Sequence, residues 1–500
     1  MKNKQLFGTD GVRGIANIYP LTIDFCTRLA ATLSTQICTK QRRVAIARDT
    51  RISGPMLFSA LCAGFTAHGI DVLDLGVIPT PLCTTLTPQL NVDMSIMITA
   101  SHNPYQDNGL KLIAADGNKF SDAQTAALEE ALAADLAPAY DSAKIGTITQ
   151  HEAGLANYRT TIAKIAPQNA LHGMKIVLDS ANGAFSGILP QIFADLGAKI
   201  ISLADSPNGS NINQDCGSQH TENLSRVVAE NGYDLGIAVD GDGDRIIICD
   251  ENGKRLDGDQ IIAFLATYMH KHGLLKNKAV VATIYSNLGL GKYIRSLGLD
   301  FYATAVGERY VIEKMHEIGA NLGGEESGHM VLSDYALTGD ALIAAVMVCL
   351  GVKELAQPVS RIFPVFTPFP AKAYNLRFEN KEIISALLAK PEVERCIEQI
   401  KTDLEGHGTI LVRKSGTEPV IRLKIEDELF QRWAYCRMQQ FNPDNLPFAD
   451  SLYRYGIFKD NYRYKCLALD LEFPIRFAQG NYARMDSSVA EIKELMKDHR

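Results

Sequence analysis

The sequence contains no two cysteines in the C-x-x-C spacing, although it has 10 cysteines among its 500 residues. Thiols scattered in this way do not match a zinc ribbon or a compact disulfide framework. We expect them to be reduced, as in a cytoplasmic protein. The segment that follows Met1, KNKQLFGTDGVRG, also lacks the apolar core of a secretory signal.

Long apolar runs and long basic runs are missing as well. The longest apolar stretch, ALIAAVMVCLGV at 341–352, is too short to cross a bilayer and predicts a buried helix. The net charge is −7, so neither nucleic acid nor a membrane is expected as a partner. The composition, 46% hydrophobic and 21% charged, is that of an ordinary globular protein.

Short apolar runs alternate with helical patterns through the first four-fifths of the chain. Residues 43–49 predict a strand, 56–69 a helix that ends at a glycine, and 71–76 the next strand. Further buried strands are predicted in MSIMITA, KIVLDSANG, LGIAVDGDGD and AVVATIYSN. This alternation predicts α/β domains with mostly parallel sheets, in which ligands bind beyond the carboxyl ends of the strands.

The chain is too long for one core, so we expect three or four domains. An alanine-rich helix at 122–141 should end the first domain, 250–258 carries an Asn-Gly hairpin signal, and the proline-rich segment 363–370 predicts a stiff linker. The predicted limits are three α/β domains at 1–150, 151–252 and 253–362, a smaller α+β domain at 371–426, and an atypical C-terminal segment at 427–500.

The stretch AVDGDGDRIIICDE at 238–251 places three aspartates at alternate positions after a predicted strand. In an extended turn Asp240, Asp242 and Asp244 would point the same way, and their mutual repulsion predicts a divalent cation such as Mg²⁺ or Mn²⁺. An EF-hand is excluded, because Arg245 stands where that loop needs glycine and a strand follows. A solvated acidic turn is the alternative.

Ser101 lies in TASHNPYQDNG, directly after another predicted strand. It has three interpretations: a turn residue, a hydrolase nucleophile, or a carrier of a phosphoryl group. The glycines of a nucleophile elbow are absent. A phosphoserine oxygen would fill an open position on the metal, and Lys111 would act as an acid/base group or charge partner nearby. The aspartate triplet favours the phosphoryl carrier.

Two later loops carry polar groups in dense patterns. In GGEESGHMV (323–331), Glu325, Ser327 and His329 would present an acceptor, a hydroxyl and an imidazole to the hydroxyls of a sugar, although an ordinary polar turn explains this stretch equally well. The residues of VRKSGTEPVIR (412–422) favour a phosphate cradle over a basic turn. Its binding groups are Arg413, Ser415, Gly416, Thr417 and Arg422.

Taken together, the four loops predict a mutase. A kinase would need a nucleotide motif, and a phosphatase would not need a second, distant phosphate clamp. A mutase passes the phosphoryl group of its serine to one end of a sugar monophosphate and takes the other phosphoryl group back. Positioning and charge neutralisation would supply most of the rate.

TASHNP, DGDGDR, GEESGH and RKSGTEP resemble the four signature loops of the α-D-phosphohexomutase family, in that family's order. The resemblance covers about residues 4–426. Within the family, FGTDGVRG (7–14), RDTRISG (48–54), YSNLGL (285–290) and VGERYV (306–311) are similar to the branch that acts on glucosamine phosphate. Position 326 departs from that branch, since Glu stands where Gln or Asn is more usual.

The resemblance implies three related α/β domains and a fourth α+β domain. It implies that Ser101 is phosphorylated and, with Asp240, Asp242 and Asp244, binds one Mg²⁺ per chain. Arg13 and Lys111 would assist proton transfer, Glu325, Ser327 and His329 would lie at the sugar, and the 412–422 loop would hold the distal phosphate.

The implied reaction interconverts glucosamine 6-phosphate and glucosamine 1-phosphate in a cytoplasmic monomer or homodimer, with a hexose or hexosamine 1,6-bisphosphate as activator. This reaction lies on the route to UDP-N-acetylglucosamine and the cell wall. Alternatives are a phosphomannomutase/phosphoglucomutase of the same family, or a non-catalytic sugar-phosphate binding protein. The last follows from residues 427–500, which match no family pattern and hold the only tryptophan, Trp433.

Overall fold

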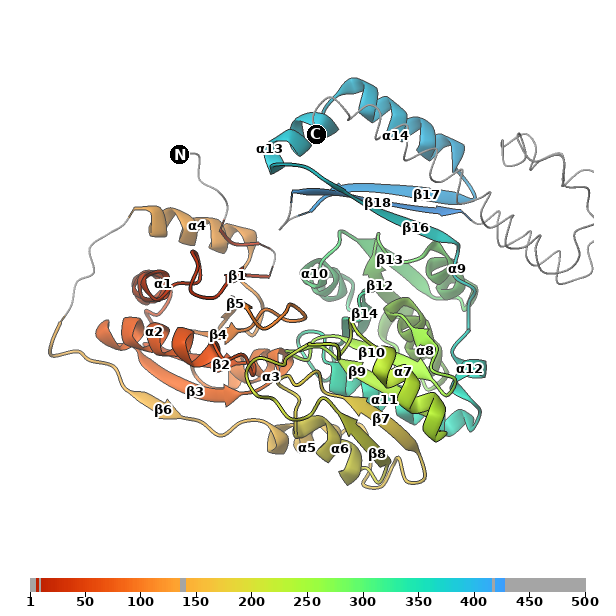
Figure 1. Ribbon diagram of the computed structural model, residues 1–500, viewed down its shortest axis with the longest axis horizontal. Coiled ribbons are helices and arrows are strands. Elements are labelled where there is room, and N and C mark those ends of the chain that lie inside the picture. The colour runs from red at the N-terminus through yellow and green to blue at the C-terminus, as the bar shows by residue number, and fades with distance from the viewer. Residues whose placement is uncertain (1–5, 9, 135–140, 416–418, 428–500) are drawn as a thin grey trace, which may run out of the picture. The chain divides into compact units, whose positions relative to one another are not determined.

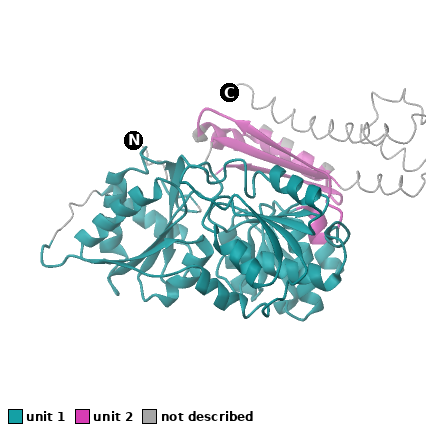
Figure 2. Ribbon diagram, turned by 60° about the horizontal axis from the view of Figure 1, so that its bottom comes forward, with its two compact units in different colours: residues 1–286, 293–365 teal, residues 287–292, 366–500 magenta. Residues whose placement is uncertain are grey.

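The computed structural model describes residues 6–8, 10–134, 141–415 and 419–427, without the side chains of residues 381, 382, 392, 396 and 403. The chain divides into two compact units (Figure 2). The larger comprises residues 1–286 and 293–365, and the smaller comprises residues 287–292 and 366–500. The second division falls within 363–370, where the prolines predict a linker.

The larger unit begins with a six-stranded sheet in the order β1-β5-β4-β2-β3-β6 (Figure 1). Strands β4, β2, β3 and β6 are parallel to one another, while β5 is antiparallel to both of its neighbours, β1 and β4. Helices α1, α2 and α4 share one hydrophobic core with this sheet. The elements are β1 (Val12–Ile15), α1 (Ile23–Gln36), β2 (Arg43–Arg48), α2 (Gly54–Ala67), β3 (Asp71–Val77), α3 (Thr80–Leu86), β4 (Met94–Ile98), β5 (Asp107–Ala114), α4 (Asp122–Ala133) and β6 (Ile148–Gln150).

A second sheet follows in the order β11-β10-β9-β7-β8. Strands β7, β8 and β9 are parallel, and β10 and β11 add an antiparallel edge. All residues of β9 and β10 are buried, as their continuous apolar sequences predict. The elements are α5 (Leu155–Ile162), β7 (Lys175–Asp179), α6 (Ile188–Asp195), β8 (Lys199–Leu203), α7 (Glu222–Asn231), β9 (Leu235–Val239), β10 (Ile246–Asp250) and β11 (Arg255–Leu256).

The third sheet has the order β13-β12-β14-β15. Its last two strands form a short antiparallel pair that carries the polar loop 325–329. The elements are α8 (Gly258–Lys271), β12 (Ala279–Thr283), α9 (Leu288–Ser296), β13 (Asp300–Thr304), α10 (Glu308–Ile318), β14 (Leu322–Gly324), β15 (Met330–Leu332), α11 (Ala341–Leu355) and α12 (Val359–Ile362).

The smaller unit is an α+β structure with its own hydrophobic core. Its sheet has the order β16-β18-β17 and is antiparallel throughout. Leu376, Leu387, Val393 and Leu423 are among the buried residues that join the sheet to two helices. The elements are β16 (Ala371–Arg377), α13 (Lys381–Leu388), α14 (Pro391–Asp403), β17 (Gly408–Lys414) and β18 (Val420–Asp427).

The structure confirms the strands predicted from the sequence and the buried helix at 341–352, which is α11. The predicted helix at 122–141 is α4, which ends at Ala133, and residues 135–140 of that prediction lie outside the described residues. The Asn-Gly signal marks the β10–β11 hairpin, where Gly253 has a φ of 77°. None of the helices in the described chain is long and apolar enough to cross a membrane. Residues 428–500 lie outside the described chain.

Candidate active site

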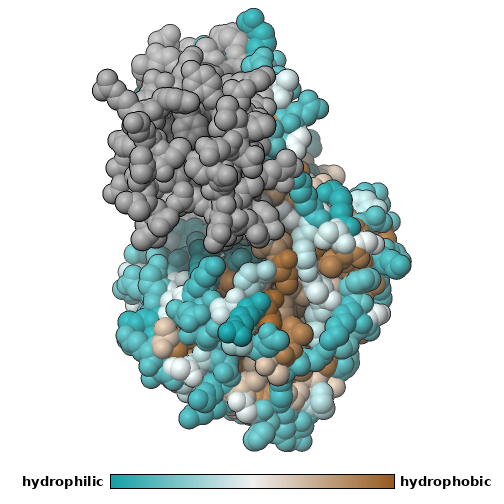
Figure 3. All heavy atoms as spheres, turned by 90° about the vertical axis from the view of Figure 1, so that its right-hand side faces the viewer, coloured by the Kyte–Doolittle hydropathy of each residue, from teal (hydrophilic) through white to brown (hydrophobic). Residues whose placement is uncertain are grey.

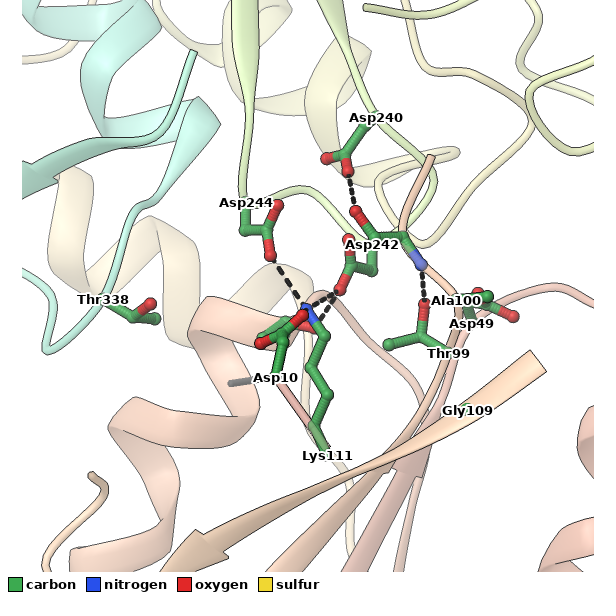
Figure 4. A network of polar contacts seen from close by, with 12 residues as sticks. Asp10, Asp49, Thr99, Ala100, Gly109, Lys111, Asp240, Asp242, Asp244 and Thr338 are labelled. Carbon is green, nitrogen blue, oxygen red and sulfur yellow. Dashed lines mark hydrogen bonds and ion pairs between the residues drawn. The ribbon is translucent and has the colours of Figure 1, made fainter. Parts of the chain in front are cut away.

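Three aspartates follow strand β9 at its carboxyl end. Asp240, Asp242 and Asp244 are buried, and one carboxylate oxygen of each lies within 4.8 Å of the others (Figure 4). They converge through a turn, in which the N–H of Gly243 donates to the carbonyl of Asp240 at 3.1 Å, and not through the extended alternation that we expected. Gly243 has a φ of 77°, which glycine adopts without strain.

The electrostatics of the triad favour a cation. Burial and the charges of Asp244 and Asp242 raise the pKa of Asp240 well above its usual value. Burial acts in the same direction on Asp244, but Lys111 and His329 outweigh it and hold the pKa of that carboxyl well below its usual value. Within the described residues, Asp242 Oδ1 is buried without a hydrogen-bond partner. An all-oxygen cluster with an unsatisfied oxygen fits a hard divalent cation.

Ser101 follows strand β4 and meets the triad. Its hydroxyl donates to Asp240 Oδ2 at 2.6 Å, across 139 positions of sequence. The residue is buried and has a φ of 54°, an uncommon backbone conformation for a residue other than glycine. On its other side, Oγ lies 3.3 Å from His102 Nδ1, and burial with nearby positive charges lowers the pKa of His102 to about 3. The serine hydroxyl therefore lies between a carboxylate and a neutral imidazole.

Lys111 and Arg13 come from the adjacent antiparallel strands β5 and β1. Lys111 Nζ donates to Asp242 Oδ2 at 2.7 Å and to Asp244 Oδ2 at 2.9 Å. Arg13 donates to Asp10 Oδ2 at 2.5 Å, and Lys111 lies 3.4 Å from the same oxygen. Burial opposes the charge of Lys111, but the three carboxylates raise its pKa well above the usual value. Lys111 is therefore a protonated charge partner of the triad.

The polar loop between β14 and β15 also reaches the triad. His329 Nε2 lies 3.1 Å from Asp244 Oδ1, and His329 Nδ1 lies 2.8 Å from Glu325 Oε2. Burial lowers the affinity of His329 for a proton, but Asp244 outweighs it and raises the pKa to about 10. A protonated imidazole donates from both nitrogens, so we assign Nε2 as donor to Asp244 and not as acceptor from Arg245 Nε at 3.3 Å. Ser327 is exposed.

The predicted phosphate-binding residues lie in the smaller unit. Arg413 on β17 and Arg422 on β18 are direct cross-strand partners, and both are half-buried. Ser415 follows β17, is buried, and its N–H donates to the carbonyl of Val420 at 2.8 Å. Gly416 and Thr417 lie outside the described residues. Because residues directly opposite on neighbouring strands project from the same face of a sheet, both guanidinium groups come from one face of this sheet.

Sequence reasoning missed two charged groups at this site. Asp10 is three residues from Arg13 and pairs with it, with Lys111 and with Lys119. Arg51 is fully buried and contacts the loop that begins at Ser101. A signal for Arg51 was present, because it follows strand β2 at the same sheet edge that carries Ser101.

Four models of the phosphoglucomutase/phosphomannomutase family match the chain. They describe an alpha/beta/alpha domain I at residues 4–138, domain II at 156–253, domain III at 257–369 and a C-terminal domain at 374–433. The four matches follow one another in order and cover most of the chain.

Two similar proteins, both named phosphoglucosamine mutase, come from Granulibacter bethesdensis and Gluconacetobacter diazotrophicus. They are 44% and 43% identical to this chain over 432 and 431 residues, which is 86% and 85% of this chain and 94% of each relative.

The fold is shared with solved structures. One is a phosphoglucomutase/phosphomannomutase family protein from Burkholderia thailandensis, with a TM-score of 0.71, 22% identity, and coverage of 91% of this chain and 98% of that one. Another is N-acetylphosphoglucosamine mutase from Aspergillus fumigatus in complex with GlcNAc-6P and magnesium, with a TM-score of 0.60, 15% identity, and coverage of 85% and 92%. With four consecutive domain matches and relatives 44% and 43% identical along nearly their whole length, the chain belongs to the phosphoglucomutase/phosphomannomutase family of α-D-phosphohexomutases.

Proposed function

We propose that the chain is a phosphoglucosamine mutase, which interconverts D-glucosamine 6-phosphate and α-D-glucosamine 1-phosphate. The observation that carries the proposal is the 2.6 Å hydrogen bond from Ser101 to the aspartate triad, because it unites the two loops that phosphoryl transfer requires. The choice of amino sugar is supported by the names of the relatives at 44% and 43% identity.

In this proposal Ser101 carries the phosphoryl group. The bond between phosphorus and Ser101 Oγ breaks as a bond forms to a free hydroxyl of the sugar monophosphate, and the hydroxyl proton ends on Oγ. The resulting 1,6-bisphosphate reorients, and its other phosphoryl group returns to the serine in the reverse sequence. A hexose or hexosamine 1,6-bisphosphate would phosphorylate an unmodified enzyme in the same way.

Asp240, Asp242 and Asp244 would hold one Mg²⁺, with an oxygen of phosphorylated Ser101 as a further ligand. The all-oxygen donor set and the unsatisfied Asp242 Oδ1 fit this ion. When bound, Mg²⁺ supplies charge neutralisation for the transferring phosphoryl group. Asp240 also positions Ser101, because its carboxylate accepts the hydrogen bond of the serine hydroxyl.

Charged neighbours would complete the site. Lys111 remains protonated beside two carboxylates, so its contribution is to stabilise negative charge that develops on the phosphoryl oxygens. Arg13, held by Asp10, would assist in the same region. Glu325, Ser327 and His329 would meet the sugar. In the smaller unit, Arg413, Ser415, Gly416, Thr417 and Arg422 would bind the phosphate that is not being transferred.

The test is isomerisation by the purified 500-residue chain with Mg²⁺ and a trace of glucose 1,6-bisphosphate. Glucosamine, glucose and mannose monophosphates are compared at equal concentration. Ser101→Ala should abolish phosphoenzyme formation and turnover. Ser34→Ala is the matched control, since Ser34 is a buried serine that donates to Ala30 within α1.

Each outcome distinguishes the proposal from its alternatives. Preference for glucosamine phosphate supports the proposed substrate, and preference for mannose or glucose phosphate assigns another activity of the same family. Binding of sugar phosphates by calorimetry without isomerisation of any of them would leave only a binding protein. Full activity of Ser101→Ala would exclude the phosphoserine.

A further inference from the structure

We propose that Arg51 is a positioning residue, which acts together with Asp49 and Asn213 to hold the Ser101 loop (residues 101–107) in the conformation that directs the serine hydroxyl toward Asp240. The inference rests on the proposed function, because it concerns the loop that would carry the phosphoryl group. It assigns a task to three polar residues that are all buried.

Arg51 has the largest fully buried side chain in the described chain, and its five N–H donors are all used. Nε donates to Asp49 at 2.8 Å. The other four bonds go to main-chain carbonyls of the Ser101 loop: residues 101 (2.9 Å), 103 (2.8 Å), 104 and 107 (2.9 Å). A single rigid guanidinium thus holds four carbonyls of one loop. A lysine could not copy this fork geometry, because its ammonium group is a single point charge.

Asp49 holds Ser101, the first residue of the same loop, through Thr99. Its Oδ2 accepts the Thr99 hydroxyl at 2.7 Å, and Thr99 Oγ1 accepts the N–H of Ser101 at 2.9 Å. Both Asp49 and Thr99 are buried. The N–H and the carbonyl of Ser101 are therefore both fixed, one through Asp49 and Thr99 and the other through Arg51.

Asn213 holds the loop from the other side. Its side-chain amide donates to the carbonyl of Ser101 at 2.9 Å and to that of Asn103 at 3.0 Å, so it shares two carbonyls with Arg51. Asn213 lies in the connection between β8 and α7, beside the second sheet, whereas Arg51 follows β2 of the first sheet. The loop is thus held between connecting segments that belong to two separate sheets.

The conformation needs such support because it is unfavourable on its own. Ser101 has a φ of 54°, in the left-handed region that residues other than glycine rarely adopt. A residue keeps this backbone conformation only where surrounding contacts fix it. The direction of Oγ depends on this backbone conformation. Loss of the contacts would let the residue relax and move Oγ away from Asp240, to which it now donates at 2.6 Å.

Arg51→Lys is the main test. Arg48→Lys is its matched control, because Arg48 forms its ion pair, of 2.7 Å, with Asp74 and not with the Ser101 loop. Steady-state kinetics, the rate of Ser101 phosphorylation by glucose 1,6-bisphosphate from intact mass, and a crystal structure are recorded. We expect kcat and the phosphorylation rate per folded molecule to fall about 100-fold in Arg51→Lys, with KM for the sugar phosphate nearly unchanged. The φ of Ser101 should become negative, and Arg48→Lys should retain normal kinetics.

Normal turnover per folded molecule in Arg51→Lys would overturn the proposal, even if the variant melted earlier, because it would reduce Arg51 to a structural role. If Arg51→Lys does not fold, Asn213→Ala decides, since it removes two of the loop's hydrogen bonds and leaves those of Arg51. A loss of kcat in Asn213→Ala at unchanged KM supports the proposal, and normal kcat overturns it. An inactive wild-type chain would count against the proposed function instead, and the phosphorylation rate and the φ of Ser101 would still test the positioning role.

Discussion

Lys119 and Glu308 form an ion pair of 2.7 Å between Nζ and Oε2, although 189 positions separate them in the chain. Lys119 also donates to Asp10 at 2.6 Å, and the second carboxylate oxygen of Glu308 accepts the hydroxyl of Thr338 and the N–H of Gly339. Burial opposes the charge of Lys119, but Asp10 and Glu308 raise its pKa, so the pair stays ionised. The pair links the segment after β5 to the start of helix α10.

We expect Glu308→Gln to destabilise the larger unit by about 3 kcal/mol, because it leaves a buried ammonium with one fewer carboxylate. Glutamine keeps an acceptor for Thr338 and Gly339, so the loss reports the ion pair. Arg309→Gln is the control: its partner Asp122 is 71% exposed, and we expect a loss below about 1 kcal/mol.

The measurement is urea-induced unfolding of the single variants and of Glu308→Gln combined with Lys119→Met. Residues in direct contact give non-additive free energies, so the double variant should lose less than the sum of the two single variants. Additive losses would show that the ion pair contributes nothing beyond its separate side chains.

Mg²⁺ should stabilise the chain through the aspartate triad. A ligand that binds only the folded state at 100 times its Kd contributes about 2.7 kcal/mol. We expect a rise in melting temperature with Mg²⁺, loss of that rise in Asp242→Asn, and loss of turnover when EDTA is added. Asp250→Asn is the control, because Asp250 closes the β10–β11 hairpin and lies outside the triad. An equal rise in Asp242→Asn would place the ion elsewhere.

Gly241 allows the triad loop to approach Ser101 closely. A Cβ at this position would lie 2.7 Å from the carbonyl oxygen of Ser101 and 2.8 Å from the Asn213 amide nitrogen. Gly241→Ala should therefore separate the two loops and lower kcat about 100-fold, since a displacement near 1 Å is enough for such a loss. Gly54→Ala, whose Cβ would have no neighbour nearer than 3.5 Å, should keep normal kinetics. Steady-state assays with glucosamine phosphate compare the two, and equal activity would contradict the crowding argument.

Most residues predicted from the sequence lie in short, locally dense patterns in the loops that follow strands, although Lys111 and Arg13 lie within β5 and β1. Asp240, Asp242 and Asp244 stand at alternate positions within five residues, so their type and spacing were visible without the fold. Ser101 could be linked to them only as a hypothesis, because 139 positions separate it from Asp240. Ser101 follows β4 and the triad follows β9, which belong to different sheets. The strand pattern therefore placed each loop at the carboxyl end of a strand, where ligands bind, but it could not show that the two loops meet.

The parts that sequence reasoning missed depend on contacts between distant segments. Lys119 stands in an ordinary-looking stretch and Glu308 in the quoted VGERYV motif, but nothing local marks the two as partners. Arg51 lies in a quoted motif, but its burial follows from the path of the Ser101 loop around it. The triad also converges through a turn instead of an extended segment, because the 3.1 Å hydrogen bond between Gly243 and Asp240 fixes local geometry that spacing alone does not specify.

Asp340 should make stability depend on pH. It caps helix α11 by accepting the N–H groups of Leu342 and Ile343 at 3.0 and 3.1 Å, and Tyr158 donates to it at 3.0 Å. Burial raises its pKa to about 7 against these hydrogen bonds, from an ordinary value near 3.8. The folded state therefore binds this proton more tightly than the unfolded state does. Its contribution to stability is fully present below about pH 4 and is lost as the pH rises to about 7.

Asp340→Asn removes this titration and keeps an oxygen that can cap the helix. The stability of the variant relative to the wild type should therefore increase as the pH rises from about 4 to about 7, by at most about 1.4 kcal/mol for each pH unit. Thermal unfolding of both proteins across this range gives the difference directly, and titration of the other carboxylates cancels in the comparison. A difference that stays constant with pH would mean that Asp340 titrates alike in the folded and unfolded chain. Its hydrogen bonds with Leu342, Ile343 and Tyr158 would then offset the effect of burial completely.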